Sequence, residues 1–426
     1  MVAKASEDLP SLLTALGLVA LVFASYATVL GTAGWIWDDP EYVTRNPVPN
    51  GAIENGLWAI WTDTTATPQY YPMVHSSFWL EWRLFPSQPV TEGGTSILVP
   101  NPTGFHLTNV LMMAGTVLLF WRILLRLRIP GAVLAAALFA VHPVNVESVA
   151  WITERKNMLS GLFALAAVGC YLRFAGIGGP GADDRPRRAY ILALVFFVCG
   201  LLSKTVIAFV PAALLLLVWW RRPDQYKRHL LPLLPMLVLG VLAGLNTARI
   251  EVEQVSAGTV YFDRARVDRC LLAGRVVWTY LLHLGMPFEQ IFFYPKWQPD
   301  PTSVWQWILL AGVLPFLAAA VFSTRVLGRG PLVAILIFGG ALVPVMGFLD
   351  VYPFRFSWVA DHFQYHANFS MFALLGAALT RIRLPARASA VSFGILLLGL
   401  AFLTGRQGLV YRDQETLWRD TIAKNP

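Results

Sequence analysis

Long apolar stretches separated by polar segments run along most of the chain. Crossing roughly 30 Å of hydrocarbon takes about 20 apolar helical residues at about 1.5 Å each. On this basis we predict membrane spans at residues 11–31, 104–121, 131–148, 157–172, 190–203, 206–220, 230–245, 303–322, 331–349, 366–380 and 389–404. The pattern therefore predicts an all-α polytopic membrane protein with about 11 transmembrane helices.

Two segments need a separate interpretation. The apolar run of residues 11–31 is too long for the core of a signal peptide, so we interpret it as an uncleaved anchor. Residues 267–286 have a helical pattern that Arg275 and His283 interrupt. We interpret this second segment as re-entrant or interfacial, because counting it as a span would reverse the side of everything after it.

The first polar loop, residues 32–103, is unusually long, since structureless loops beyond about 12–15 residues are uncommon and often functional. Within it, residues 69–85 interleave aromatic residues with His75, Glu81 and Arg83. This pattern is typical of a helix that lies in the membrane interface. A packed loop helix is a compatible alternative.

Composition agrees with a membrane protein. Hydrophobic residues make up 56% of the 426 and charged residues only 14%, with a mean hydropathy of +0.56. An ordinary soluble domain carries about 25% charged residues, and a disordered chain is less hydrophobic. The cysteines lack CxxC spacing, so neither a disulfide framework nor a zinc site is expected; they are Cys170, Cys199 and Cys270.

The charges predict the orientation. With a cytoplasmic N-terminus, the short inner segments hold 17 of the 33 basic residues but only 5 of the 25 acidic ones. Basic residues concentrate in cytoplasmic loops, so the net charge of +8 is assigned to the membrane rather than to nucleic acid. We therefore expect the C-terminus and the polar chemistry on the extracytoplasmic side.

An acidic pair, Asp38 and Asp39, directly follows the first span. Clustered carboxylates repel one another, which raises the pKa of one of them and suits it to act as a base. A solvated loop with Asp-Pro turn chemistry is the alternative.

The second outer segment, residues 142–161, carries ionisable side chains beside apolar helix, where they usually face a cavity or a partner. Arg155 and Lys156 suit a phosphate, and Glu147 suits an acceptor or a base; a solvated salt-bridge set is the alternative. Lys204, isolated between two spans, needs an anion, either a lipid headgroup or a lipid-phosphate substrate.

The last large outer segment, residues 350–368, brings further ionisable groups to the same side. His362 and His366 share a helical face next to Asp361, but an HxxxH pair without further ligands is weak support for a metal, and we predict none. After the last span, residues 411–426 form an amphipathic helix with apolar spacing similar to a first tetratricopeptide helix. One such helix cannot bury its apolar face alone, so it either continues into more repeats or packs on the membrane domain.

The order of these segments resembles one family. It resembles the membrane half of the tetratricopeptide-bearing O-mannosyltransferases and their bacterial relatives, of the GT-C glycosyltransferase superfamily. The segments are WDDPEYV, QYYPMV, FWLEWRLF, NPTGFHLTNVLM, HPVNVESVAWITERKNMLS, GLLSKT, FYPKW and VADHFQY. The resemblance implies a GT-C-type bundle over residues 1–404 with interfacial helices in the outer loops, followed by the start of a tetratricopeptide helix at 405–426.

The resemblance also implies a reaction. A sugar, with mannose as a candidate, is expected to move with inversion from a polyprenyl phosphate to an acceptor hydroxyl, that of a protein Ser or Thr. The expected place is the outer face of a bacterial inner or plasma membrane. Asp38 matches the position of the catalytic base, with Asp39 second. Acceptor or site-positioning roles are assigned to Glu147, His142 and His75. Donor-phosphate roles are assigned to Arg155, Lys156, Lys204, Arg355 and His362, although eukaryotic members resemble Glu-Arg where this chain has Asp361 and His362.

The expected partners are membrane lipid, the lipid-linked donor and an acceptor protein or glycan, with no nucleic acid and no cofactor besides the lipid-phosphate sugar. Two alternatives remain. One is a transporter or flippase, which would place ionisable groups near the bilayer midplane and often shows inverted repeats. The other is a GT-C enzyme that acts on a lipid or a cell-wall polymer.

Overall fold

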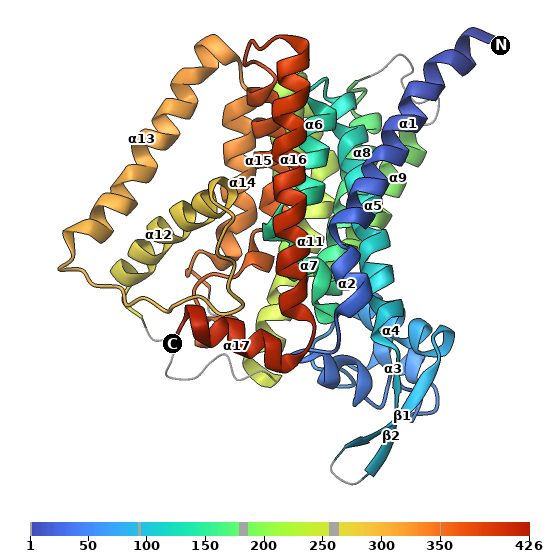
Figure 1. The fold of residues 1–426 in the computed structure, drawn as a ribbon. Helices are drawn as coiled ribbons and strands as arrows, with labels where there is room; N and C mark the ends of the chain where they lie inside the picture. The colour runs from blue at the N-terminus through green and yellow to red at the C-terminus, as the bar shows by residue number, and fades with distance from the viewer. Residues whose placement is uncertain (1, 93–94, 179–185, 255–263, 350) are drawn as a thin grey trace.

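The structure is a computed structural model that describes residues 2–92, 95–178, 186–254, 264–349 and 351–426. Its helices form an upright bundle (Figure 1). The bundle contains α1 (Val2–Ser25), α2 (Ala27–Thr32), α5 (Pro102–Arg126), α6 (Ala132–Val141), α7 (Val146–Ala150), α8 (Arg155–Phe174), α9 (Pro186–Leu201), α10 (Val210–Arg221), α11 (Leu230–Gln254), α12 (Arg266–Gly285), α13 (Val304–Leu327), α14 (Gly330–Leu342), α15 (Tyr365–Leu379) and α16 (Ala386–Gly408). Parts of two predicted loops, 179–185 and 255–263, lie outside the described residues.

The remaining elements gather at one end of the bundle, which we call the loop face. They are α3 (Gly56–Thr62), α4 (Pro72–Leu84), β1 (Ser87–Glu92), β2 (Thr95–Pro100) and α17 (Gln414–Lys424) (Figure 1). The N-terminus lies at the opposite end. The two ends of the chain are therefore separated by the length of the bundle, as an odd number of crossings requires.

The predicted helical membrane fold is confirmed, whereas the number of spans is not. The eleven predicted segments fall largely on helical residues. Within the described ranges, five helices are long and apolar enough to cross a membrane, and a bent pair makes a sixth. Three shorter apolar helices accompany them, at Ser11–Ser25, Thr205–Arg221 and Gly330–Val345. The helix α12 is not among either set.

The predicted span 131–148 is wrong as a single straight helix. The helix α6 ends at Val141, and the next segment, Pro143–Ala150, turns away by 59°. His142 takes an extended conformation (φ −79°, ψ 128°), because a following proline disfavours the helical region. The bend turns α7 into the interior near the loop face instead of letting it continue straight.

A two-stranded hairpin in the first loop departs from the all-α prediction. β1 and β2 pair antiparallel, with Ser87 opposite Pro100 and Val90 opposite Ile97. The sequence carries the signal, since the pair Gly93-Gly94 stands between two runs rich in β-branched residues, a composition typical of hairpins. The hairpin projects from the loop face (Figure 1).

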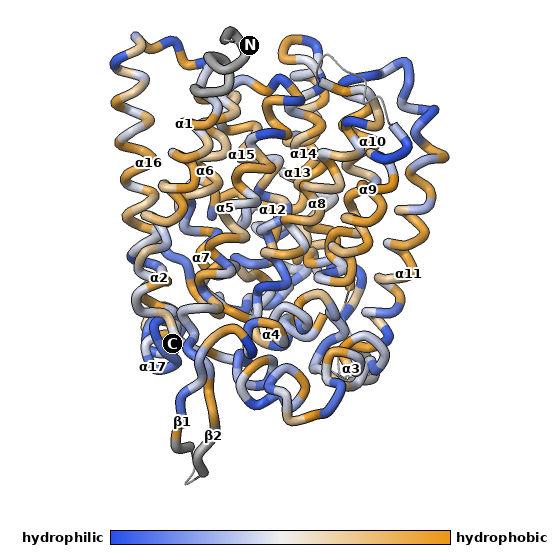
Figure 2. The backbone as a smooth tube through the Cα atoms, turned by 90° about the vertical axis from the view of Figure 1, so that its right-hand side faces the viewer, coloured by the Kyte–Doolittle hydropathy of each residue, from blue (hydrophilic) through white to orange (hydrophobic). Residues whose placement is uncertain are grey.

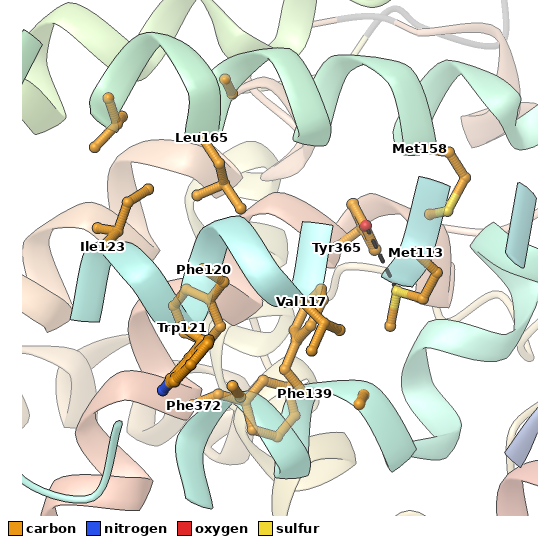
Figure 3. Packing of buried hydrophobic residues seen from close by; sticks show 14 of the residues in the cluster. Met113, Val117, Phe120, Trp121, Ile123, Phe139, Met158, Leu165, Tyr365 and Phe372 are labelled. Carbon is orange, nitrogen blue, oxygen red and sulfur yellow. Dashed lines mark hydrogen bonds between the residues drawn. The ribbon is translucent and has the colours of Figure 1, made fainter. Parts of the chain in front are cut away.

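The bundle core is apolar and closely packed. Figure 3 shows Val117 of α5 beside Phe139 of α6, and Met113 of α5 beside Tyr365, whose hydroxyl lies 3.9 Å from the Met113 sulfur. A Cβ added at Gly376 would lie 2.6 Å from the Cβ of Ala135, so α6 and α15 approach as closely as small residues allow.

The outer surfaces of several bundle helices are also apolar. Leu314 of α13 and Leu398 of α16 are each 71% exposed. Figure 2 shows hydrophobic residues along the bundle helices and hydrophilic ones at both ends. A bundle that is apolar inside and outside is the pattern expected for a protein whose solvent is lipid.

Candidate active site

The acidic pair lies in the loop that follows α2, on the inner side of the loop face. Asp39 is fully buried and accepts three hydrogen bonds, from the backbone N–H of Thr153 (2.8 Å), the hydroxyl of Thr153 (2.6 Å) and the backbone N–H of Ile36 (2.9 Å). Burial, then the charge of Asp38, raises the pKa of Asp39 to about 8 against the effect of these donors. Asp39 therefore joins the first loop to the turn before α8.

Asp38, unlike Asp39, is only half-buried. Its Oδ1 accepts a hydrogen bond from Nε1 of Trp151 at 3.1 Å. Burial raises the pKa of Asp38 to about 6, and the nearby Lys156 charge opposes this shift. A carboxylate with a raised pKa that is still accessible is suited to accept a proton near neutral pH.

Two lysines share one buried glutamate beside Asp38. Nζ of Lys204 lies 3.0 Å from Oε2 of Glu154, and Nζ of Lys156 lies 3.4 Å from Oε1. Lys204 also donates to Oδ1 of Asn157 at 2.9 Å. Two ammonium groups thus lie next to one another, and a pair of lysines suits the binding of an anion.

A set of polar and aromatic side chains from the first loop lies against the lysine pair. Oε1 of Gln69 accepts from the Tyr42 hydroxyl at 2.8 Å and from Nζ of Lys156 at 3.4 Å. Nζ of Lys156 is 5.0 Å from the Tyr42 ring centroid, within cation–π range. His75 is fully buried and stacks on Tyr42 (5.6 Å), and burial lowers its pKa to about 3, so it supports Tyr42 as a neutral ring.

The last loop reaches the same place through His362. Glu147 accepts the backbone N–H of His362 at 2.8 Å, and its Oε1 lies 3.0 Å from Nδ1 of the same residue. Nε2 of His362 is 4.0 Å from Oε1 of Glu154, and its ring contacts Trp151 edge-on at 5.5 Å. The fold thus brings together five residues of the predicted site: Asp38, Lys156, Lys204, Glu147 and His362.

Arg155 points away from this site. Its guanidinium is fully buried and donates to Glu81 Oε2 (2.7 Å), to Ser77 Oγ (3.3 Å) and to the carbonyl of Phe105 (2.8 Å). It also donates to the side chain of Asn109. These contacts tie α4 and α5 to α8, so the structure gives Arg155 a packing role in place of the predicted contact with phosphate.

Two further predicted residues, His142 and Arg355, are held by other elements of the fold. Both ring nitrogens of His142 contact backbone, with Nε2 3.2 Å from the Leu284 carbonyl and Nδ1 accepting from Val144. His142 therefore fixes the bend between α6 and α7 against the end of α12. Arg355 is exposed in the turn Tyr352–Arg355, next to Phe356, whose ring contacts Trp37 at 5.6 Å.

The assigned site set lacks three residues that organise the network: Glu154, Trp151 and Gln69. The run Thr153-Glu154-Arg155-Lys156 signals a polar cluster, but in sequence Glu154 resembles one member of a solvated salt-bridge set. Its burial is decided by the turn Ile152–Glu154, which ends as α8 begins and directs Glu154 toward Lys204. No local pattern reveals that long-range contact.

An apolar cavity of about 440 Å³ lies between α5, α8, α10, α14 and α15. Phe120, Leu165 and Phe369 line its wall, and Arg128 and Arg381 line its far end. His366 lines the end nearer the site, where its Nε2 lies 2.9 Å from Oγ of Ser160. The charges of Lys204 and Glu154 also act on His366, so this end of the cavity lies near the lysine pair.

Across the described part of the chain, no group of three or more His, Cys, Asp or Glu side chains is arranged to hold a metal ion. The candidate site brings together a half-buried carboxylate, two lysines and one end of an apolar cavity.

Comparison with known proteins gives partial matches. A protein O-mannosyl-transferase of Caenorhabditis elegans is 29% identical over 163 residues, which cover 35% of this chain and 22% of that protein. The protein O-mannosyl-transferase Tmtc2 of Drosophila melanogaster is 30% identical over 200 residues, or 45% of this chain and 20% of the relative. The matched part spans about a fifth of the length of these relatives.

No known family profile matches the chain. Among solved structures, ArnT from Cupriavidus metallidurans bound to undecaprenyl phosphate aligns with 96% of this chain and 76% of its own, with a TM-score of 0.43 and 14% identity. The resemblance predicted from the motifs is confirmed by the curated matches: over part of its length, the chain is a distant relative of the protein O-mannosyl-transferases.

Proposed function

We propose that this protein is an inverting membrane glycosyltransferase. It moves a sugar from a polyprenyl phosphate to an acceptor hydroxyl at the loop face, which we place outside the cell. One observation carries the proposal: the half-buried Asp38 lies beside the lysine pair of Lys156 and Lys204 at the end of an apolar cavity. A base, an anion site and a place for a lipid chain are the three parts that this reaction needs.

The proposed chemistry is a single displacement. Asp38 takes the proton from the acceptor hydroxyl, the acceptor oxygen forms a bond to the anomeric carbon, and the bond from that carbon to the phosphate oxygen breaks. Lys156 and Lys204 stabilise the charge on the departing polyprenyl phosphate, with His362 beside them. No cofactor besides the lipid-phosphate sugar enters this scheme, and the exposed Arg355 is a further candidate for phosphate contact.

The cavity supports a lipid-linked donor. From His366 to Leu379, α15 rises about 20 Å at about 1.5 Å per residue, which is about two thirds of the roughly 30 Å hydrocarbon layer. A chain lying along this wall meets mainly Phe, Leu, Val and Ala side chains. The phosphate would then lie at the His366 end, near the lysine pair.

The relatives are named protein O-mannosyl-transferases, which favours mannose as the sugar and a protein as the acceptor, and we propose a Ser or Thr hydroxyl as the acceptor group. We assign catalysis to residues 1–404 and regard 405–426 as the start of a tetratricopeptide-like segment. In this scheme Glu147 orients His362, while His75 and His142 position the surrounding elements. An acceptor lipid or cell-wall polymer would use the same base and the same lysine pair.

The test is to incubate the purified protein in vesicles with labelled polyprenyl-phosphate mannose and with other polyprenyl-phosphate sugars. A Ser/Thr-rich peptide and a cell-wall glycan serve as acceptors in separate reactions, and Asp38→Asn is the matched control. We expect label to move to one acceptor in the wild type and not in the variant. Absence of both transfer and donor hydrolysis for every donor would refute the proposed reaction.

A further inference from the structure

We propose that α17 holds the base Asp38 in its working position through Trp418, which makes Trp418 a positioning residue. The inference rests on the proposed function for the role of Asp38. Its structural basis is an aromatic cluster that joins α17 to the residue immediately before Asp38.

Trp37 is the centre of this cluster. Its ring lies edge-on to the rings of four residues, with centroid distances of 5.2 Å to Phe293, 5.3 Å to Trp418, 5.6 Å to Phe356 and 6.1 Å to Phe292. These distances and tilts are those of favourable aromatic pairs. The first loop, the segment before α13, the last loop and α17 therefore meet at one side chain.

The backbone at Trp37 needs this support. Its φ is +46°, in the left-handed region that a bulky L-residue rarely occupies. Such a conformation persists only where the surroundings hold it in place. Because Asp38 is the next residue, a relaxation of φ at Trp37 would swing the Asp38 carboxylate out of its present place.

A second route leads from α17 to the same carboxylate. Phe292 contacts Trp418 at 6.4 Å and Trp151 at 5.2 Å. Trp151 is the residue whose indole N–H donates to Asp38. The cluster thus acts on Asp38 from two sides, through its neighbour in the chain and through its hydrogen-bond donor.

The helix itself is firmly attached. Leu417 is fully buried, Nζ of Lys424 donates to the Gln290 carbonyl at 2.9 Å, and Nδ2 of Asn425 donates to the Phe293 carbonyl at 2.9 Å. At its start, the backbone N–H of Gly34 donates to the Tyr411 carbonyl at 3.3 Å. A shift of α17 would therefore move Trp418 and also pull on the backbone at Phe293 and Gly34, on either side of Trp37 in the cluster.

The lysine pair has a different anchor, since Lys156 and Lys204 are held by Glu154 and Asn157. Loss of Trp418 should consequently disturb the base and spare the donor site. Proton transfer needs a separation of about 2.6–3.2 Å, and an error of about 1 Å can cost roughly 100-fold in rate.

The experiment compares Trp418→Ala, Trp418→Phe and a control, Ile422→Ala, which changes a 61% exposed residue on the same helix. We expect Trp418→Ala to lower kcat by roughly 10–100-fold, with the KM for the lipid-phosphate sugar within about twofold of wild type. The acid limb of its pH–rate profile should move to lower pH, because an Asp38 released into water is a weaker base. Trp418→Phe should restore most of the rate, and Ile422→Ala should behave as wild type.

A second readout does not depend on transfer. Carbodiimides react with protonated carboxyl groups, so Asp38 labelling, followed by peptide mass spectrometry over a pH series, should have its pH profile moved to lower pH in Trp418→Ala relative to the wild type and Ile422→Ala. A folded Trp418→Ala protein with wild-type kcat and wild-type labelling of Asp38 would overturn the inference. If the wild type transfers no sugar, the proposed function fails, and the labelling comparison still decides whether α17 positions Asp38.

Discussion

At the scale of single residues, Asp38 and Asp39 are neighbours with opposite surroundings. Asp38 accepts a hydrogen bond from Trp151 and remains partly exposed, whereas Asp39 is fully buried and accepts three hydrogen bonds. We therefore expect Asp38→Asn to fold and bind donor normally while transfer falls by about 10²–10⁴, the usual contribution of a general base. Rates of a well-folded variant in the vesicle assay check this, and a near wild-type rate would remove Asp38 as the base.

Asp39→Asn should act through stability. Above about pH 8, where the Asp39 carboxyl is ionised and only accepts, an asparagine offers one acceptor oxygen in its place, so the NH₂ group must face a donor, either the N–H of Ile36 or the two donors of Thr153. Leaving a buried donor unpaired costs about 1–3 kcal/mol. Thermal unfolding should show a lower Tm for Asp39→Asn than for Asp38→Asn. An Asp39→Asn protein that is inactive but fully stable would identify Asp39 as the base.

The pH profile follows from the pKa of Asp38, which burial raises to about 6. Below that pH the carboxyl is protonated and cannot accept the proton of the acceptor. The donor-saturated rate should therefore increase about tenfold per pH unit below pH 6 and level off above it. Rates measured from pH 4.5 to 8 test this, and the residual activity of Asp38→Asn should lack the acid limb.

At the scale of elements, the start of α8 directs two adjacent cations to different neighbours. Arg155 pairs with the buried Glu81 of α4, and Lys156 faces the site. Removing one partner of a buried ion pair typically costs about 3–5 kcal/mol. Arg155→Ala should therefore lower the Tm strongly. Glu81→Gln keeps an acceptor oxygen and should lower the Tm less. An Arg155→Ala protein that has normal stability but fails to bind the donor would show instead that Arg155 contacts the phosphate.

The turn between α9 and α10 supplies the second site cation, Lys204, which is tied to Glu154 and Asn157. Lys204→Ala should weaken donor binding by about 2–5 kcal/mol, or from about 30-fold to several thousand-fold in Kd. Binding of a fluorescent polyprenyl phosphate measures this effect. Arg355→Ala is the matched comparison, since Arg355 is exposed and a smaller loss is expected there.

At the scale of the whole molecule, the opposite positions of the N-terminus and α17 make topology testable. Reporter fusions after residues 100, 180, 225 and 426 should read outside, inside, inside and outside, because the predicted inner segments carry the basic residues. A cytoplasmic readout at 426 would mean that α12 crosses the membrane after all.

The sequence is enough to predict the helices, because a membrane helix is recognisable from the local run of apolar residues. It also names most of the residues that we assign to the candidate site. It does not suffice for the bend at Pro143, where the apolar run continues although the helix stops. Nor does it distinguish Arg155 from Lys156, since the direction of each side chain depends on partners in distant segments, Glu81 for one and Gln69 for the other. The contact of Trp37 with Trp418 joins residues 381 positions apart and has no local signal.

The cavity between α5, α8, α10, α14 and α15 has a consequence for kinetics. A donor whose tail fills it is dissolved in the bilayer and arrives by lateral diffusion in two dimensions. The relevant concentration is then its mole fraction among the surrounding lipids, not its amount per volume of buffer. Adding inert phospholipid at constant amounts of protein and donor should therefore slow turnover, just as adding buffer dilutes a soluble substrate and slows its enzyme. In the cell, the lipid composition of the membrane would then set the rate.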